Sequence, residues 1–255
     1  MDKRIGAQLY TVRDLIKTEE EFISVMKKLS DIGYKSIQFS GVGAIASPER
    51  LREICDGFGL KIACTHKGYN DYKDKIDEMI AFHKALDCDI AGLGSLPVAF
   101  RKSSLEEVDE AIDALNRASE KLEENGMVLG YHNHAFEFAK LENGQTLFSR
   151  LLEKGRFTFI LDLYWLAFAG LNPAKFLEQL GDRVSVIHYK DMKVKLDNTV
   201  TYTEVGAGTL NFDEIVKASG KARWAMVEQD LCEDFDPVTS LENSYNYITE
   251  KYDFI

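Results

Sequence analysis

The chain has 255 residues, of which 45% are hydrophobic and 29% are charged, so it is long enough to bury one large core. Its formal net charge of −11 leaves no excess of Lys and Arg to neutralise a phosphate backbone, which argues against a nucleic-acid partner. The apolar runs are only strand-length and are interrupted, which argues against a membrane span.

The four cysteines indicate a reducing compartment. They are scattered and form no CxxC pair, at Cys55, Cys64, Cys88 and Cys232. Residues 1–10 run directly into a strand pattern and show no apolar signal-peptide core. We therefore expect a cytoplasmic protein with no membrane partner. A homo-oligomer is compatible with the sequence, which does not identify interface patches.

Strand-like apolar runs recur along the whole chain and predict an α/β fold. They begin near Ile5, Lys35, Lys61, Asp89, Met127, Phe157, Val184 and Trp224. Eight such runs, most of them separated by helical patterns, predict a (β/α)8 TIM barrel. No linker or low-complexity tract marks a second domain, so the barrel is expected to be a single domain covering residues 1–255.

The segments between these runs carry helix start signals. Thr18 and Glu21 form a capping box ahead of an apolar stripe that begins at Phe22. Further helix starts are predicted at Ser47-Pro48, Ser104 with Glu107, Asn172-Pro173 and Asp236-Pro237.

A doubly wound sheet is the competing α/β architecture. It usually has a glycine-rich phosphate loop after its first strand, whereas residues 9–13 here contain no glycine, which favours the barrel. The longest connection, from about residue 191 to 211, is predicted to be an irregular loop over the barrel mouth. Gly206 and Gly208 would let it move as a lid.

Four side chains that can bind a metal come at the ends of successive predicted strands. They are His132, Asp162, His188 and Glu228. Because the carboxyl ends of parallel barrel strands meet at one mouth, we expect these side chains to converge. Two imidazoles and two carboxylates suit one divalent metal ion, with Mn, Co, Zn or Fe favoured over Mg, which prefers oxygen ligands.

Each of these residues also has a structural interpretation. Asp162 could form a salt bridge or cap a helix, and His188 could be a buried core histidine. Glu228 could pair with Lys190 or Arg13 instead of binding a metal.

The sequence does not decide which residue of the fifth strand binds the metal. His132 and His134 point to the same side of the strand because side chains alternate with period two. Either could therefore bind the metal, and Glu137 is a further contributor from the following loop.

Four residues are candidates for substrate contacts. Tyr10 and Trp165 could stack on a sugar face or simply pack. His66 could bind a substrate hydroxyl or be structural, and Lys190 could be solvated or contact a substrate anion. His83 lies inside a helical pattern and is interpreted as structural.

Taken together, these motifs resemble the xylose-isomerase-like barrel superfamily of sugar phosphate isomerases and epimerases, which also includes inosose dehydratase and the type IV apurinic endonucleases. The resemblance covers nearly all of the chain. It rests on residues 8–13, 33–35, 131–138 and 188–191, on Asp162 with Trp165, on the glycine loop 205–208 and on Glu228.

The resemblance implies a metal held by Glu, Asp, His and Glu from the fifth to the eighth strand. Asp162, His188 and Glu228 match the last three of these ligands. His132 stands where the first glutamate is usual, and Ala207 stands where the glycine loop commonly has an acidic residue.

These features predict a metal-dependent sugar isomerase or epimerase that acts on a keto-sugar or sugar derivative. A bound ion would make the proton beside the substrate carbonyl acidic, and a carboxylate would remove it. Glu228 is the predicted base, with His134 or Glu137 as alternatives. Because His132 replaces a glutamate, a dehydratase or lyase acting on a keto-sugar, keto-glycoside or keto-inositol is the second hypothesis.

Two further classes are less favoured. A nuclease with three zinc ions would need more histidines than the five present. A non-catalytic sugar-binding accessory subunit is disfavoured by the intact Asp162, His188 and Glu228. No basic cluster marks a phosphate site, which favours an unphosphorylated sugar.

Overall fold

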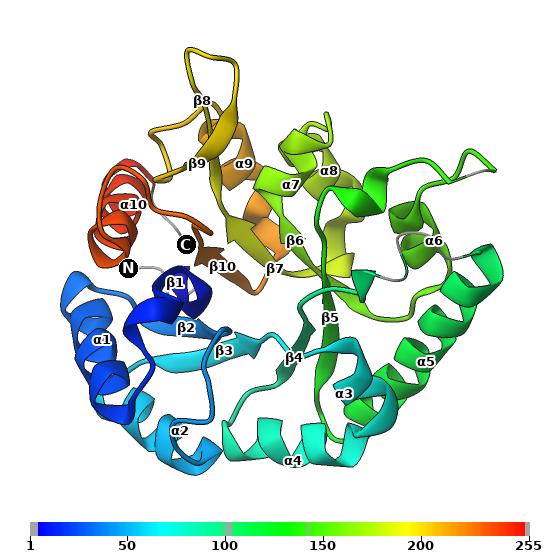
Figure 1. Cartoon of the computed structure of the whole chain (residues 1–255), viewed down its shortest axis with the longest axis horizontal. Coiled ribbons are helices and arrows are strands. Elements are labelled where there is room, and N and C mark those ends of the chain that lie inside the picture. Colours follow the sequence, from blue (N-terminus) through cyan, green and yellow to red (C-terminus); the bar gives the residue numbers. More distant parts are fainter. Residues whose placement is uncertain (1–4, 99, 101–103, 142, 253–255) are drawn as a thin grey trace.

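The computed structural model describes residues 5–98, 100, 104–141 and 143–252, and its centre is a barrel of eight parallel strands (Figure 1). The strands are β1 (Ile5–Gln8), β2 (Ser36–Phe39), β3 (Lys61–Thr65), β4 (Ile90–Leu93), β5 (Val128–His132), β6 (Thr158–Asp162), β7 (Val184–Tyr189) and β10 (Trp224–Val227). Their order is β3-β2-β1-β10-β7-β6-β5-β4. The predicted single-domain barrel is confirmed, and every strand begins within one residue of its predicted start.

The helices form a ring outside the barrel (Figure 1). They are α1 (Glu19–Ile32), α2 (Pro48–Gly57), α3 (Tyr69–Asp74), α4 (Ile76–Ala85), α5 (Leu105–Glu123), α6 (Leu147–Lys154), α7 (Leu163–Phe168), α8 (Pro173–Leu180), α9 (Phe212–Ala218) and α10 (Pro237–Lys251). The capping boxes at Thr18 and Ser104 are present, as are the N-caps at Ser47, Asn172 and Asp236. Within the described ranges, none of these helices has the length and apolar character to cross a bilayer.

Most of the core lies between the strands and the helices. The apolar stripe of α1, from Phe22 to Leu29, is fully buried against the sheet, as its helical spacing predicts. A smaller cluster of buried residues comes from strands on several sides of the barrel: Ala63, Cys64, Ile90, Ile160, Val186 and Met226. All four cysteines are free thiols.

The barrel closes between β3 and β4 through a short contact beyond the end of β3. The Lys67 N–H donates to the Gly92 carbonyl (2.8 Å), and the Gly94 N–H donates to the Lys67 carbonyl (3.1 Å). The Gly92 N–H also donates to Oγ1 of Thr65 (3.3 Å). The two strands approach so closely at this point that a side chain on Gly92 would have no room.

The connection after β7 is not the irregular loop that the sequence predicted. Strands β8 (Asp191–Val194) and β9 (Val200–Thr203) pair as an antiparallel hairpin that projects from the barrel rim (Figure 1). Among the described strands, β8 and β9 form a separate two-stranded sheet. They are short and lack the apolar run that marks a barrel strand, which is why the sequence did not predict them.

The glycines that follow this hairpin allow the backbone to pack closely against the Asp191 carboxylate and the Tyr247 ring. The N–H groups of Gly206 and Gly208 both donate to Oδ2 of Asp191, at 2.9 and 3.1 Å. A Cβ on Gly208 would overlap the Asp191 carboxylate, and Gly206 has a φ of +91° against the Tyr247 ring. Close packing therefore requires these two glycines, and their role as hinges stays a prediction. Movement of the hairpin itself stays a prediction.

Gly92→Ala should destabilise the barrel. The new Cβ would overlap the Thr65 carbonyl and lie 2.8 Å from Cδ1 of Ile160, so we expect a loss of about 1–3 kcal/mol or more in the free energy of unfolding. Gly57→Ala at the end of α2 is the control, because its Cβ would meet nothing within 4 Å. Urea unfolding followed by circular dichroism measures both, and equal stability of the two variants would contradict the packing argument.

Candidate active site and metal centre

A cavity of about 350 Å³ opens at the carboxyl ends of the barrel strands. Its lining residues are Tyr10, Arg13, Ser40, His66, Gly94, Ser95, His132, His134, Lys190, Glu228 and Asp230. Tyr10, which follows β1, and Asp230, which follows β10, thus line the same cavity although they lie near opposite ends of the sequence. Six of the predicted site residues are in this lining, and Asp162 and His188 lie fully buried next to it.

Asp162 has one structural oxygen and one that faces the site. It ends β6, and its Oδ1 accepts a hydrogen bond from the Trp165 N–H (3.1 Å), which caps α7. Its Oδ2 lies 3.3 Å from Nζ of Lys190 and 3.6 Å from Nδ1 of His188. The Asp162 backbone N–H donates to Oδ1 of Asn133 (2.9 Å), which fixes the end of the strand. The capping interpretation is therefore confirmed for Oδ1, and metal binding through Oδ2 stays a prediction.

His188 is oriented by a partner on the opposite side of the barrel. Its Nε2 lies 2.7 Å from Oε1 of Gln38, which can only accept, so Nε2 carries the hydrogen. Nδ1 lies 2.7 Å from Oε2 of Glu228, but the carboxylate oxygen is not aligned with the ring nitrogen as in a regular hydrogen bond. Burial alone would lower the pKa of His188, but the Glu228 and Asp162 carboxylates raise it to about 9. The polar Gln38 within an apolar strand is the sequence signal for this contact.

Lys190 is a buried member of the site. Its side chain is 1% exposed, and Nζ lies 2.8 Å from Asp230 Oδ1 and 3.3 Å from both Asp162 Oδ2 and Glu228 Oε2. Burial alone would lower the pKa of Lys190, but the three carboxylates raise it well above its usual value. The solvated-lysine interpretation is therefore wrong, because the ammonium has exchanged water for carboxylate partners.

Two cavity residues have roles that the sequence did not identify. Asp230 was not predicted, yet it lines the cavity and pairs with Lys190. Its position two residues after Glu228 was the available signal. Arg13 donates to the backbone carbonyls of Tyr10 (2.7 Å) and Asp230 (3.0 Å). Of the two cations proposed as partners of Glu228, Lys190 and Arg13, it is therefore Lys190 that pairs with it.

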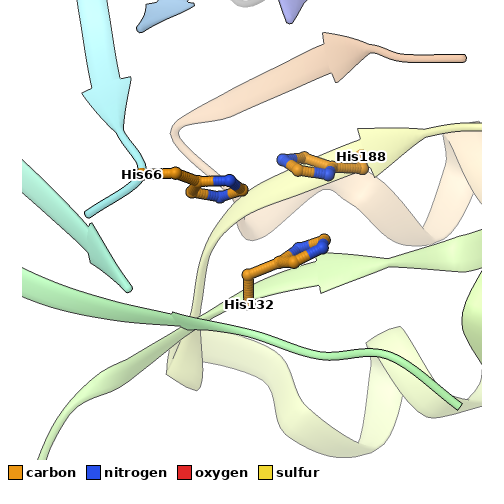
Figure 2. A group of neighbouring side chains, drawn as sticks. All are labelled: His66, His132 and His188. Carbon is orange, nitrogen blue, oxygen red and sulfur yellow. The ribbon is translucent and has the colours of Figure 1, made fainter. Parts of the chain in front are cut away.

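Three histidines gather in the centre of the site (Figure 2). The ring centroids of His132 and His188 are 4.6 Å apart, and those of His66 and His132 are 4.8 Å apart. Nε2 of His132 lies 4.0 Å from Oδ2 of Asp162. Burial and the nearby His188 lower the pKa of His132 below its usual range, so its ring is neutral.

The geometry favours His132 over His134 as a metal ligand. Among the described residues, His132 belongs to a group of possible metal-binding atoms with His66 and His188, whereas no such group contains His134, whose ring lies 5.6 Å from that of Trp165. The carboxylate of Glu137 is directed elsewhere: it accepts hydrogen bonds from the Tyr131 hydroxyl (2.9 Å) and the His134 N–H (2.8 Å). We therefore interpret Glu137 as a residue that positions this segment, in place of the predicted catalytic role.

The predicted aromatic residues occupy different positions. Tyr10 is 38% exposed at the cavity edge, with the Arg13 guanidinium 4.2 Å from its ring centroid. Trp165 lies outside the lining and forms an aromatic group with Tyr164 and Tyr202 around Lys190, whose Nζ is 5.3–5.9 Å from the three ring centroids. Tyr10 thus remains a candidate for stacking on a sugar, whereas Trp165 supports Lys190. His83, bonded to Thr65 and the Met79 carbonyl, is structural.

The donor atoms fit a divalent metal ion. The ligand atoms of Asp162, His188 and Glu228 all lie within 4.8 Å of one another. His132 lies beside this group, with Nε2 4.0 Å from Oδ2 of Asp162. The three carboxylates outnumber the Lys190 ammonium. Either a protonated His188 or a divalent cation can offset the remaining negative charge.

Comparisons with known proteins give one family. A sequence model of the xylose isomerase-like TIM barrel family matches residues 26–236. Inosose dehydratase of Geobacillus thermodenitrificans (strain NG80-2) is 22% identical over an alignment of 253 positions, which covers 91% of this chain and 79% of the relative.

Solved structures share the fold at low sequence identity. A sugar phosphate isomerase/epimerase from Parabacteroides distasonis ATCC 8503 superposes with a TM-score of 0.83 at 20% identity, over 97% of this chain and 94% of that one. A probable 3-DHS dehydratase from Bacillus anthracis has a TM-score of 0.76 at 14% identity, over 98% of this chain and 100% of that one.

Lys190→Met should destabilise the metal-free protein by about 3–5 kcal/mol, because it leaves buried carboxylates without their cation. Lys193→Met is the matched control, since the exposed Lys193 pairs only at the surface with Asp234 (2.6 Å) and should matter much less. Denaturant unfolding of chelator-treated protein measures the difference. If both variants unfold at the same denaturant concentration, Lys190 does not have the stabilising role described.

Proposed function

Because the chain belongs to the xylose isomerase-like TIM barrel family, we propose that it is a metal-dependent sugar isomerase or epimerase that acts on a keto-sugar or keto-sugar derivative. The observation that supports this best is the convergence of Asp162, His188 and Glu228 beside one cavity. At about 350 Å³, the cavity is at the small end of the range of about 300–1,000 Å³ for ligand pockets, which suits a single sugar ring.

Asp162, His188 and Glu228 would hold the metal, with His132 as a fourth ligand. When bound, a divalent ion would polarise a substrate carbonyl and make the neighbouring C–H proton more acidic. Gln38 keeps Nδ1 of His188 available by accepting the hydrogen of Nε2. Such outer contacts orient ligands and raise metal affinity.

Glu228 is the proposed base. It borders the cavity, and Lys190 and His188 lower its pKa against the opposing effect of burial, so the carboxylate is ionised, as a base must be. Asp162 is less suited, because one of its oxygens is committed to capping α7. Asp230 also borders the cavity and is the next candidate.

The distribution of groups around the cavity favours a dehydratase or lyase as a second candidate. The carboxylates Glu228 and Asp230 follow β10, whereas the histidines follow β3 and end β5. Elimination needs one base and a proton donor for the departing oxygen, and His134 at the cavity edge is the proposed donor. The similarity to inosose dehydratase supports this candidate.

An unphosphorylated substrate is proposed, because the cations that line the cavity are already engaged. Arg13 donates to two backbone carbonyls, and Lys190 is surrounded by three carboxylates. Neither offers a ready site for a phosphate group, whereas carboxylates and imidazoles can bind sugar hydroxyls.

The wild-type protein should contain about one equivalent of divalent metal per chain, a stoichiometry typical of a single catalytic site. Asp162→Ala should remove most of it. Glu204→Gln is the matched control: Glu204 is also buried, but its carboxylate accepts from Ser240 and Thr203 away from the cavity. Elemental analysis of protein purified without chelator provides the count. Full metal content in Asp162→Ala would reject the proposed site.

Glu228→Gln should slow turnover by about 100-fold or more, because it keeps the size of the side chain but removes its basicity. Deuterium exchange beside the substrate carbonyl should fall in parallel, at matched metal occupancy. NMR of a keto-sugar panel in heavy water measures exchange and separates epimers and isomers from elimination products. Exchange at the wild-type rate would place the base elsewhere, with Asp230 or His134 as the next residues to test.

A further inference from the structure

His66, His132 and His188 form a group of metal-binding nitrogens that extends beyond the four predicted ligands. Figure 2 shows the three rings around a common space, each from a different strand or strand end. One nitrogen of each ring lies within 4.8 Å of the others. The centroids of His66 and His188 are 5.5 Å apart, so His66 is as much part of the group as its neighbours.

Some of the nitrogens that face the common space of the three rings lack hydrogen-bond partners. In the described part of the chain, Nε2 of His66 and Nδ1 of His132 are buried without one, whereas Nδ1 of His188 lies 2.7 Å from the Glu228 carboxylate. Buried polar atoms in this state are uncommon, and two such atoms in neighbouring rings require a physical explanation. The rings of His66 and His132 are neutral, and a neutral imidazole nitrogen is a strong ligand for a divalent metal. An ion bound in the common space could replace the proton of His188 and bind all three rings.

The outer nitrogens of two of these rings are bound by neighbouring side chains. Nδ1 of His66 lies 3.5 Å from Oγ of Ser40, and Nε2 of His188 lies 2.7 Å from Oε1 of Gln38. Both partners come from β2 or the residue after it. This is the arrangement by which proteins fix the ring orientation of metal-binding histidines.

We propose that His66 is a ligand of a divalent ion that it binds together with His132 and His188, and that His188 connects this group to Asp162 and Glu228. This inference rests on the metal-dependent function proposed above. Nitrogen ligands disfavour Mg²⁺ and favour Zn²⁺ or Co²⁺, so the centre should bind Zn²⁺ and Co²⁺ more tightly than Mg²⁺. His66 then binds the metal instead of a substrate hydroxyl.

Calorimetric titration of chelator-treated protein with Zn²⁺, Co²⁺ and Mg²⁺ tests the proposal. Wild type should bind Zn²⁺ and Co²⁺ much more tightly than Mg²⁺. His66→Asn should weaken Zn²⁺ binding by at least about tenfold, and Ser40→Ala should weaken it less. The visible spectrum of the Co²⁺ form should also change in His66→Asn. Ser95→Ala is the control, since Ser95 lines the same cavity but its hydroxyl donates to the Leu96 carbonyl (2.9 Å).

The outcomes separate this inference from the proposed function. Wild type without bound Zn²⁺ or Co²⁺ would overturn both. Wild type that binds Zn²⁺ while His66→Asn keeps the same affinity and Co²⁺ spectrum would overturn the role of His66 alone, and a raised KM would then identify a substrate contact. Equal affinity for Mg²⁺ and Zn²⁺ would also contradict a histidine face. Thermal unfolding of the metal-free variants checks folding, and His66→Gln repeats the test with a longer side chain.

Discussion

The buried ammonium of Lys190 allows three carboxylates to lie close together at the mouth of the barrel. Asp162 ends β6, and Glu228 and Asp230 follow β10, so the parallel strands bring like charges to one place. At this degree of burial, such charges would repel one another strongly without a cation between them. Much of the rim is arranged around this cluster: Asp162 caps α7, and an aromatic group from α7 and β9 packs around the lysine.

The opposite side of the cavity has a different character. There the side chains are imidazoles, and burial lowers the pKa of His66 to about 3, with His188 adding to the effect. Neutral rings have lone pairs but little charge of their own. The site therefore combines a negatively charged half, partly compensated by Lys190, with a neutral half rich in nitrogen donors. A divalent cation bound between them would receive both charge neutralisation and ligands.

His132 distinguishes this site from the pattern that the family resemblance implies. A glutamate at that position would add a negative charge and a second carboxylate base, whereas the buried imidazole adds neither. The change affects both parts of the proposed chemistry. It moves the ligand set toward nitrogen, and it leaves the carboxylates on one side of the substrate. Proton transfer on the other side then falls to a histidine, an arrangement that suits elimination as well as epimerisation.

The sequence by itself determined the barrel, the starts of its barrel strands and of five helices, and the position of Asp162, His188 and Glu228 at one mouth. These features follow from local patterns, such as apolar strand runs and the capping box at Thr18, which depend on residues close together in the chain. Only the tertiary structure decided which atoms meet: the burial of Lys190 beside Asp230, the turning of Glu137 toward Tyr131, and the contact of Gln38 with His188 across 150 residues. Side-chain partners of this kind depend on how distant strands pack, and no local pattern encodes that packing.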